Sequence, residues 1–351
     1  MEALSELSRK RISKKALSAV CIHPHGEMLW IGDKAGNLVA YSLPDLKELW
    51  KKPSLGAIPK KGRKELTSSS KFPNRGPVEG HYGAVLSIAV SPDGQFLASG
   101  GKDRLLAMWN AQTGESIDSF GMYRDAIQAI SFAKDPKGEK QLLFSAGADR
   151  TIRVYDVEDR ILMQNMYGHQ APILSLSAFH GNRVATVAHD ASIRLGRPEQ
   201  MTQLVYKPEE LTEAVVMLTH DIFITASQSG AVFLWRANKK KAVTHLQLTQ
   251  VDLATNEKPW LTTVAVLGAS EAGDVMVVAG DTRGSVYLVS VNTAEYEMSL
   301  VDSVQLDGVV VGLEVGGGRL AVGLAREHRF GRWEAIKGFR NAVVVYDINS
   351  M

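Results

Sequence analysis

The sequence has almost no cysteine and no long apolar segment. Cys21 is the only cysteine among 351 residues, which excludes an internal disulfide framework and a four-cysteine zinc site and suits a reducing compartment. No stretch approaches the roughly 18 apolar residues that span a bilayer, and the N-terminus lacks the basic and then apolar order of a signal peptide. We therefore predict a soluble, nuclear or cytosolic protein that does not bind membranes.

The motifs of common enzyme classes are also missing. The chain has no H-E-x-x-H, no G-x-S-x-G and no G-x-x-x-x-G-K-[ST]. Residues 316–321 formally fit G-x-G-x-x-A, but they join two predicted strands instead of opening a helix, so we interpret them as a β-turn. The histidines lack the helical spacing of metal ligands, and His23 and His25 lie in a predicted surface turn. We predict no catalytic activity, no metal and no cofactor.

Charge is unevenly distributed along the chain. The formal net charge is only +2, yet residues 1–77 carry 15 Lys and Arg against 7 Asp and Glu, which leaves 25 against 31 for residues 78–351. One basic cluster covers Arg9–Lys15. A second covers Lys51–Arg75, where Glu65 is the only acid. Basic blocks of this kind indicate a polyanionic partner or a targeting signal, although the Pro, Gly and Ser content of the second also fits a flexible solvated loop.

An internal repeat is the clearest pattern in the sequence. The pattern of residues 80–109 predicts three strands separated by turns. Pro92-Asp93-Gly94 fits a β-turn, because proline fixes φ at the first corner and glycine accepts a positive φ at the last. The same internal spacing then recurs in four copies: Ser99-Asp103-Trp109, Ser145-Asp149-Tyr155, Thr186-Asp190-Gly196 and Thr225-Ser229-Trp235. Weaker copies extend the series to seven, with strand ends at residues 41, 109, 155, 196, 235, 289 and 346.

The spacing and residue types of these copies resemble the WD40 repeat, whose blades span about 40–45 residues. The resemblance covers nearly the whole chain and implies an all-β fold, a seven-bladed WD40 β-propeller that forms one domain over residues 1–351. The longer spacings place insertions at about 51–79, 252–260 and 324–341. In this family four side chains hydrogen-bond across a blade, and one blade here has the full set: His81, Ser99, Asp103 and Trp109.

The other blades keep only part of this set. The third has Arg124 at the histidine position and Tyr155 for tryptophan, the fourth keeps His169, Thr186 and Asp190 but has Gly196, and the fifth keeps Thr225 and Trp235 but has Ser229. Because a partly satisfied buried polar network is costly, we interpret these residues as structural networks and not as catalysts.

The last repeat ends too close to Met351 for a fourth strand. An open edge invites aggregation, so we predict that residues near Arg9–Lys15 form the outer strand of the final blade and close the ring. That basic cluster would then be partly a solvated edge strand, which leaves its targeting role open.

The last insertion combines basic and aromatic residues. The run Glu327–Trp333 and the following Lys337, Phe339 and Arg340 interleave guanidinium and ammonium groups with planar rings, as RNA recognition requires. The alternative is that Phe330 and Trp333 only anchor a long loop on the propeller. The residues by themselves favour neither interpretation.

A second and narrower resemblance bears on this choice. Six segments are similar, in the same order along the chain, to the WD40 proteins specific to the U3 small nucleolar ribonucleoprotein: 109–112, 124–126, 168–170, 259–260, 327–333 and 340–341. The Glu-His-Arg-x-Gly-Arg-Trp string is the most specific of them. The resemblance implies binding to the box B/C region of U3 RNA together with a small kink-turn-binding protein, contacts with other small-subunit processome proteins, and a role in pre-rRNA processing in the nucleus and nucleolus.

We therefore predict a non-catalytic RNA- and protein-binding subunit of the U3 particle. The predicted RNA- or partner-binding residues are Lys60, Lys61, Arg63, Lys64, His328, Arg329, Arg332, Trp333 and Arg340. Two alternatives stay open. One is a WD40 scaffold that contacts only proteins, for instance by reading peptides at the central channel. The other is a propeller hydrolase, for which the sequence assembles no set of converging carboxylates, histidines or metal ligands.

Overall fold

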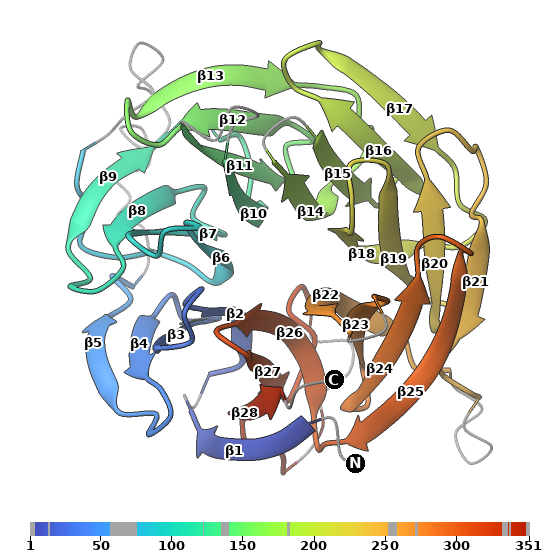
Figure 1. Ribbon diagram of the computed structural model, residues 1–351. Helices are drawn as coiled ribbons and strands as arrows, with labels where there is room; N and C mark the ends of the chain where they lie inside the picture. Colours follow the sequence, from blue (N-terminus) through green and yellow to red (C-terminus); the bar gives the residue numbers. More distant parts are fainter. Residues whose placement is uncertain are drawn as a thin grey trace.

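The chain folds into a ring of β-sheets, seen in the computed structural model (Figure 1). The structure describes residues 4–12, 15–56, 76–121, 123–134, 140–180, 183–251, 258–270, 273–331, 336 and 338–348. Within these residues the helix and strand assignments are β-strands alone. The strands form seven four-stranded antiparallel sheets. The prediction of an all-β, seven-bladed propeller is confirmed.

Each sheet is one blade, and its four strands run from the channel outward. Blades 1 to 4 consist of β2 (Leu17–Ile22), β3 (Met28–Asp33), β4 (Leu38–Ser42) and β5 (Glu48–Lys52); β6 (Val85–Val90), β7 (Phe96–Gly101), β8 (Leu106–Asn110) and β9 (Ser116–Phe120); β10 (Ile127–Lys134), β11 (Gln141–Gly147), β12 (Ile152–Asp156) and β13 (Ile161–Met166); and β14 (Ile173–Phe179), β15 (Arg183–Ala188), β16 (Ser192–Arg197) and β17 (Thr202–Tyr206). Blades 5 to 7 consist of β18 (Thr212–Met217), β19 (Ile222–Ser227), β20 (Ala231–Arg236) and β21 (Thr244–Gln247); β22 (Leu261–Ala269), β23 (Val275–Asp281), β24 (Ser285–Asn292) and β25 (Glu297–Gln305); and β26 (Val309–Gly316), β27 (Arg319–Ala325), β28 (Ala342–Ile348) and β1 (Leu4–Arg11).

The N-terminal strand closes the ring. Strand β1 pairs antiparallel with β28, from Leu4 opposite Ile348 to Arg11 opposite Ala342. The predicted closure is confirmed, but the strand begins and ends earlier than the predicted Arg9–Lys15. The reason is that β28 supplies partners only back to Ala342, so the chain has left the sheet by Lys15, whose backbone carbonyl accepts a 2.7 Å hydrogen bond from the side-chain amide of Asn341.

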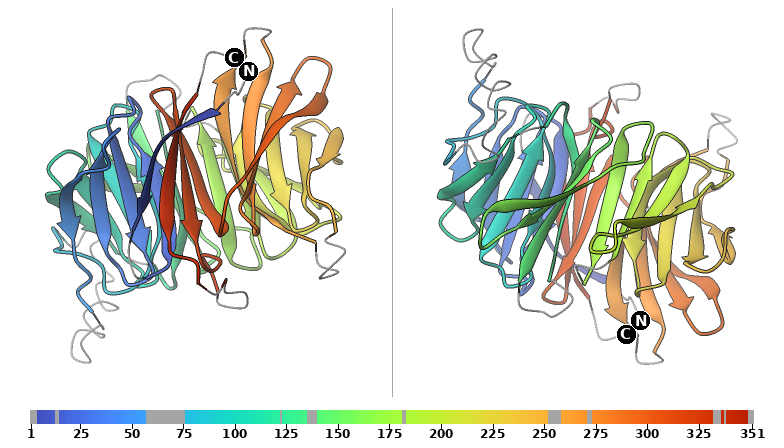
Figure 2. Two further views of the ribbon diagram at one scale, coloured as in Figure 1. Left: turned by 90° about the horizontal axis from the view of Figure 1, so that it is seen from below. Right: turned by 90° about the horizontal axis from the view of Figure 1, so that it is seen from above.

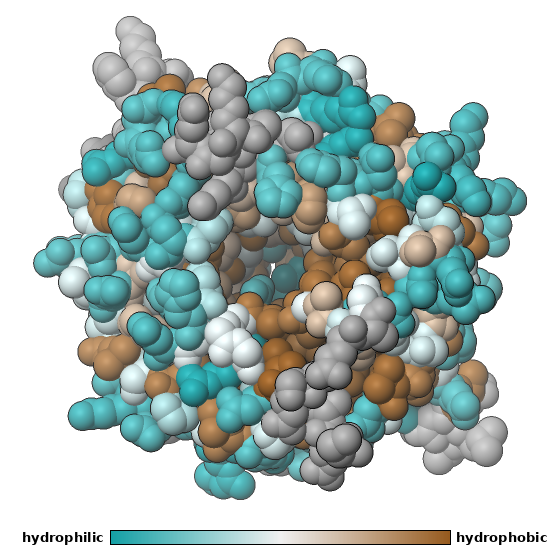
Figure 3. Space-filling view, viewed as in Figure 1, coloured by the Kyte–Doolittle hydropathy of each residue, from teal (hydrophilic) through white to brown (hydrophobic). Residues whose placement is uncertain are grey.

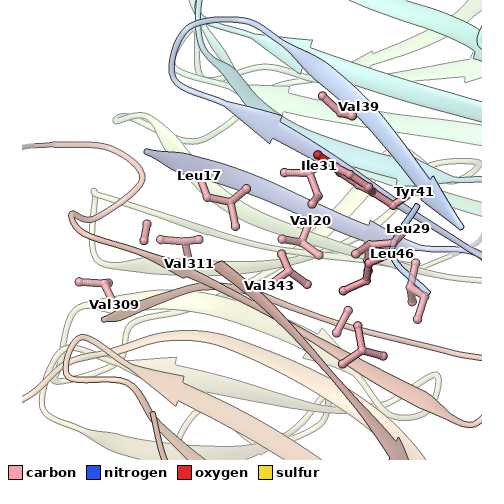
Figure 4. Close-up of a cluster of buried hydrophobic side chains, with 14 residues drawn as sticks. Leu17, Val20, Leu29, Ile31, Val39, Tyr41, Leu46, Val309, Val311 and Val343 are labelled. Carbon is pink, nitrogen blue, oxygen red and sulfur yellow. The ribbon is translucent and has the colours of Figure 1, made fainter. Parts of the chain in front are cut away.

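The apolar core lies between neighbouring blades. The closing contact between blades 7 and 1 is one such layer, in which Leu17, Val20 and Ile31 of blade 1 meet Val309, Val311 and Val343 of blade 7 (Figure 4). These residues are β-branched or leucine side chains with at most 4% of their surface exposed. Each blade covers the apolar face of the next, and the layer between blades 7 and 1 forms only when the ring closes.

Every inner strand carries the same irregularity. The pairing of the first and second strands of each blade skips one residue near its start, at residues 18, 86, 128, 174, 213, 262 and 311. A β-bulge of this type leaves the extra residue outside the regular ladder and increases the local twist. At two of these positions a hydroxyl reaches the next blade, since Ser18 Oγ donates to the Val85 carbonyl at 2.5 Å and Thr262 Oγ1 donates to the Val310 carbonyl at 2.6 Å.

The inner strands surround a central channel of about 420 Å³. Figure 3 shows its mouth on one face, ringed largely by hydrophobic residues. Glu314 on β26 lines the channel, and burial raises the pKa of its carboxyl group to about 8. The acid is therefore held mostly protonated at neutral pH.

The ring has two different faces. Because strands alternate in direction, the connections from the second to the third strand of a blade, and from one blade to the next, share one face, which we call the insertion face. The remaining connections, the start of β1 and the end of β28 lie on the opposite face, which we call the terminal face (Figure 2). The connection after β5 and the connection between β27 and β28 therefore both emerge on the insertion face.

Candidate functional site

The polar network predicted for blade 2 is assembled in the structure. The imidazole of His81 lies 2.9 Å from the carboxylate of Asp103 and 2.7 Å from Ser99 Oγ, and Trp109 Nε1 donates to the same hydroxyl at 2.8 Å. All four residues are buried. These hydrogen bonds link the segment before β6 to strands β7 and β8 and satisfy the buried polar groups between them. None of the four side chains is exposed to a substrate.

In blade 3 the predicted repeat alignment was wrong by one residue. Tyr123, and not Arg124, occupies the histidine position, since its hydroxyl lies 2.5 Å from Ser145 Oγ. Arg124 only donates its backbone N–H to the Asp149 carboxylate at 3.3 Å, as Tyr82 does to the acid of blade 2. The tyrosine side chain is long enough to reach the serine from the position that histidine occupies in blade 2. An alignment of the repeats that looks for histidine at this position does not find it.

Blade 4 keeps the histidine network without its tryptophan. His169 lies 3.1 Å from Asp190 and 2.9 Å from Thr186 Oγ1, and burial lowers the pKa of its imidazole. At Gly196 a Cβ atom would come within 2.5 Å of the methyl group of Met166. Met166 therefore packs where a side chain at position 196 would begin, in place of the tryptophan that blades 2 and 5 have at this position, and the network is structural here as well.

The motif of the last insertion forms a strap on the insertion face, which we define as residues 326–331. One end is held by blade 1. Lys34 Nζ makes a 3.0 Å ion pair with Glu327 and also donates to the backbone carbonyls of His328 at 2.7 Å and Gly331 at 3.1 Å. Glu327 is only 2% exposed, so this pair is largely shielded from solvent.

Arg329 carries the strap to the other side of the ring. Its Nη2 donates to the Leu174 carbonyl at 2.7 Å, and Leu174 is the bulged residue of the inner strand of blade 4, outside the regular ladder. Arg329 is one of the residues that line the central channel. Burial lowers its pKa to about 10, and the charge of Glu213 in blade 5 opposes this shift, so Arg329 remains a cation at neutral pH.

The neighbours of Arg329 are also directed inward. Phe330 packs on the apolar cluster between blades 4 and 5 and lies 4.3 Å from the Arg329 guanidinium. His328 is buried, which lowers its pKa to about 3, and the positive charges of Arg329 and Lys34 act in the same direction. The strap thus spans the insertion-face end of the channel, and for Phe330 the structure matches the loop-anchor interpretation.

The other predicted residues are placed differently. Arg340 is exposed, whereas its neighbour Asn341 is buried and accepts a 3.1 Å hydrogen bond from the Arg326 backbone. Arg332 and Trp333 lie outside the described residues. So do the four cations predicted in the first insertion, Lys60, Lys61, Arg63 and Lys64.

One turn of blade 1 brings the bases of the two insertions together. The turn between β3 and β4 holds the strap through Lys34, and its Asn37 Oδ1 accepts a 3.0 Å hydrogen bond from the backbone N–H of Ser54, at the start of the first insertion. The described ends of both segments are therefore neighbours on the insertion face. Nothing in the sequence around Lys34 marks this role, since it is a single lysine in a short turn.

A metal site or a membrane-spanning helix would each indicate a different kind of protein. Across the described ranges, no three His, Cys, Asp or Glu side chains gather in a way that could hold a metal ion. The same residues contain no helix of the length and apolarity that a membrane crossing needs.

A closed ring of seven four-stranded blades with an Asp–His–Ser–Trp network defines a WD40-repeat propeller. The family model "WD domain, G-beta repeat" matches residues 74–110 and 114–156, within blades 2 and 3 and the segments before them. The chain thus carries WD40 repeats.

Named relatives narrow the comparison. The chain is 28% identical to the U3 snoRNP-associated protein-like EMB2271 of Arabidopsis thaliana over 76% of this chain and 57% of that protein. It is 26% identical to Ribosomal RNA-processing protein 9 of Saccharomyces cerevisiae over 89% of this chain and 67% of that protein, and 28% identical to U3 small nucleolar RNA-interacting protein 2 of Homo sapiens over 77% and 57%. The chain thus spans little more than half the length of the Arabidopsis and human proteins.

Solved structures show the same fold. The WD40 repeats of RRP9 superpose with a TM-score of 0.84 at 22% identity, covering 99% of this chain and 100% of that one. The structure of U3-55K superposes with a TM-score of 0.82 at 23% identity, covering 98% of each chain.

Proposed function

We propose that this protein is a non-catalytic RNA- and protein-binding subunit of the U3 small nucleolar ribonucleoprotein, acting in pre-rRNA processing for the small ribosomal subunit in the nucleolus. The observation that carries this proposal is the similarity over three quarters or more of the chain to proteins named for U3 RNA and ribosomal RNA processing. The relatives are longer than this chain, so the proposal concerns the propeller and the surface that it presents.

The proposed binding surface is the insertion face near blades 1 and 7. Lys60, Lys61, Arg63 and Lys64 would follow the phosphate backbone, while Arg332, Trp333 and Arg340 would hold the box B/C region of the RNA or the kink-turn-binding protein. His328 and Arg329 act as positioning residues, because their contacts fix the strap on the ring. Other processome proteins would use the remaining faces. The strap also makes a channel-reading peptide scaffold less suitable on this face, since Arg329 and Phe330 already reach across it.

The proposal is tested by crosslinking the full protein to RNA in cells and sequencing the bound fragments. We expect U3 RNA to be enriched, with crosslinks concentrated in its box B/C region. A matched variant in which Lys60, Lys61, Arg63 and Lys64 are neutral should recover fewer U3 fragments at the same expression level. Protein partners without enriched RNA would instead support the protein-only scaffold.

Replacement of Trp333 by alanine separates binding from packing. If the indole stacks on an unpaired base, the variant should lose about 1–3 kcal/mol of RNA-binding free energy while its melting temperature stays nearly unchanged. Titration with U3 RNA and thermal unfolding are measured on the same preparation. A steep fall in melting temperature with unchanged binding of U3 RNA and of the kink-turn protein would make Trp333 a loop anchor and remove the last insertion from the binding surface.

A further inference from the structure

A groove of about 440 Å³ lies on the flank of blade 5, outside the ring of inner strands. Its walls are strands β20 and β21 and the link between blades 4 and 5 at residues 207–210, and Lys258 lies at its edge. None of the residues that form the strap or the blade 2 network lines it. The groove is therefore a feature separate from the surface proposed above.

The groove contains a pair of stacked rings. Phe233 on β20 and His245 on β21 are directly paired across the two strands, with ring centroids 5.5 Å apart and planes inclined by 23°. His245 is exposed, whereas Trp235 on the same face of β20 is buried and donates to Thr225 Oγ1 at 2.9 Å. His245 thus presents an aromatic ring to solvent with the partly buried Phe233 stacked against it, and exposed aromatic rings stack on unpaired nucleobases of any sequence.

Positive charge surrounds these rings. Lys207, Lys241 and Lys258 line the groove, and Lys239 and Lys240 precede Lys241 on the exposed connection between β20 and β21. None of the five makes an ion pair with a described acidic residue. The acids in the lining are Glu209 and Glu210, both exposed on the link at the insertion-face end. The lining thus holds three lysines against two glutamates, and Lys239 and Lys240 add two cations on the adjoining connection, which favours a polyanionic ligand.

We propose that this groove binds a single-stranded RNA segment, with one base stacked on the His245–Phe233 pair and the phosphate backbone running along Lys239, Lys240 and Lys241. The inference rests on the proposed function for its choice of RNA. An acidic peptide would satisfy the lysines but would leave the stacked rings without a planar partner. The combination of flat rings and a row of cations therefore favours unpaired RNA over both a protein segment and a duplex.

Equilibrium binding of the full chain to a labelled single-stranded oligouridylate tests the ring pair. His245→Ala should weaken binding roughly 5- to 150-fold, the range expected for loss of one stacked base. His245→Phe keeps a planar ring and should retain affinity close to that of the unchanged protein. Thermal unfolding of all variants checks the fold, and His245 is exposed, so little change is expected there.

The lysines are tested through the salt dependence of the same binding. The triple variant Lys239→Ala, Lys240→Ala, Lys241→Ala should reduce the log–log salt slope by about 0.7 for each phosphate that the protein no longer neutralises. The matching triple arginine variant should keep the slope. A control variant with Lys47→Ala and Lys102→Ala, both exposed and both outside the groove lining, should behave like the unchanged protein.

Photocrosslinking with 4-thiouridine in the same oligonucleotide supplies a second measurement, and crosslinks should map to residues 231–247. The inference is overturned if His245→Ala and the lysine variants bind like the control, or if polyglutamate outcompetes the oligonucleotide for this groove. The two proposals fail separately. Groove crosslinks to the oligonucleotide without U3 recovery from cells would reject the U3 assignment alone, and U3 recovery unaffected by the groove variants would reject the groove alone.

Discussion

Replacement of Trp109 by alanine is expected to lower the free energy of unfolding by about 3–5 kcal/mol, the cost of losing a buried tryptophan to a cavity. The side chain has 0% of its surface exposed, and its Nε1 donates to Ser99 Oγ at 2.8 Å. The change therefore removes both packing between blades and one bond of the His81 network. Urea unfolding followed by circular dichroism measures the effect.

Two further variants serve as controls for the unfolding free energy of Trp109→Ala. Trp109→Phe keeps most of the ring and loses the N–H donor, so we expect a smaller loss of about 1–3 kcal/mol. Leu49→Ala changes an apolar side chain that is 48% exposed on β5 and should stay within about 0.5 kcal/mol of the unchanged protein. If Trp109→Ala were as mild as Leu49→Ala, the stabilising role assigned to the blade 2 network would be wrong.

Neutralisation of Lys60, Lys61, Arg63 and Lys64 together should produce the largest change in RNA binding. Each phosphate left without its cation lowers the log–log salt slope by about 0.7–0.9, so four such phosphates lower it by about 3. At physiological salt this corresponds to an affinity loss of roughly 100-fold or more. Filter binding of U3 RNA over a series of salt concentrations measures slope and affinity together.

A charge-preserving control separates charge from sequence in this segment. Replacement of Lys60, Lys61 and Lys64 by arginine keeps four cations and should leave the salt slope unchanged, because the sequence-independent part of binding depends on charge. Should the neutral variant show the same slope as the unchanged protein, the segment would serve as a tether or a nuclear targeting signal and would not be a phosphate-binding arm.

Local patterns in the sequence, through their resemblance to the WD40 repeat, were sufficient to predict the blade architecture. The turn at Pro92-Asp93-Gly94 and the constant spacing from Ser99 to Trp109 each act over fewer than a dozen residues. These features recur because every blade is a four-stranded sheet that packs between two neighbouring blades. Even so, Tyr123 was missed, since a hydroxyl that reaches Ser145 satisfies the network as histidine does without belonging to the pattern.

The orientation of the last insertion was decided only by tertiary structure. Interleaved arginine and aromatic residues have the same composition whether they face solvent or the interior, so the sequence permitted both interpretations of Arg329 and Phe330. Their partners are remote in the chain: Arg329 reaches Leu174, 155 positions away, and Glu327 meets Lys34 across 293 positions.

Ring closure is the physical reason why the sequence predicted the blades but not the orientation of the strap. It places blades 1, 4 and 5 around one channel end, and the bulge at Leu174 leaves there a carbonyl that a long cation from blade 7 reaches. Burial of that contact then fixes the strap. The resemblance of the repeating local signals to the WD40 repeat thus sufficed to predict the seven blades and the network of blade 2. The direction of the strap was decided only when ring closure brought distant strands together, and the groove beside His245 forms only where the folded β20–β21 hairpin meets the link at residues 207–210.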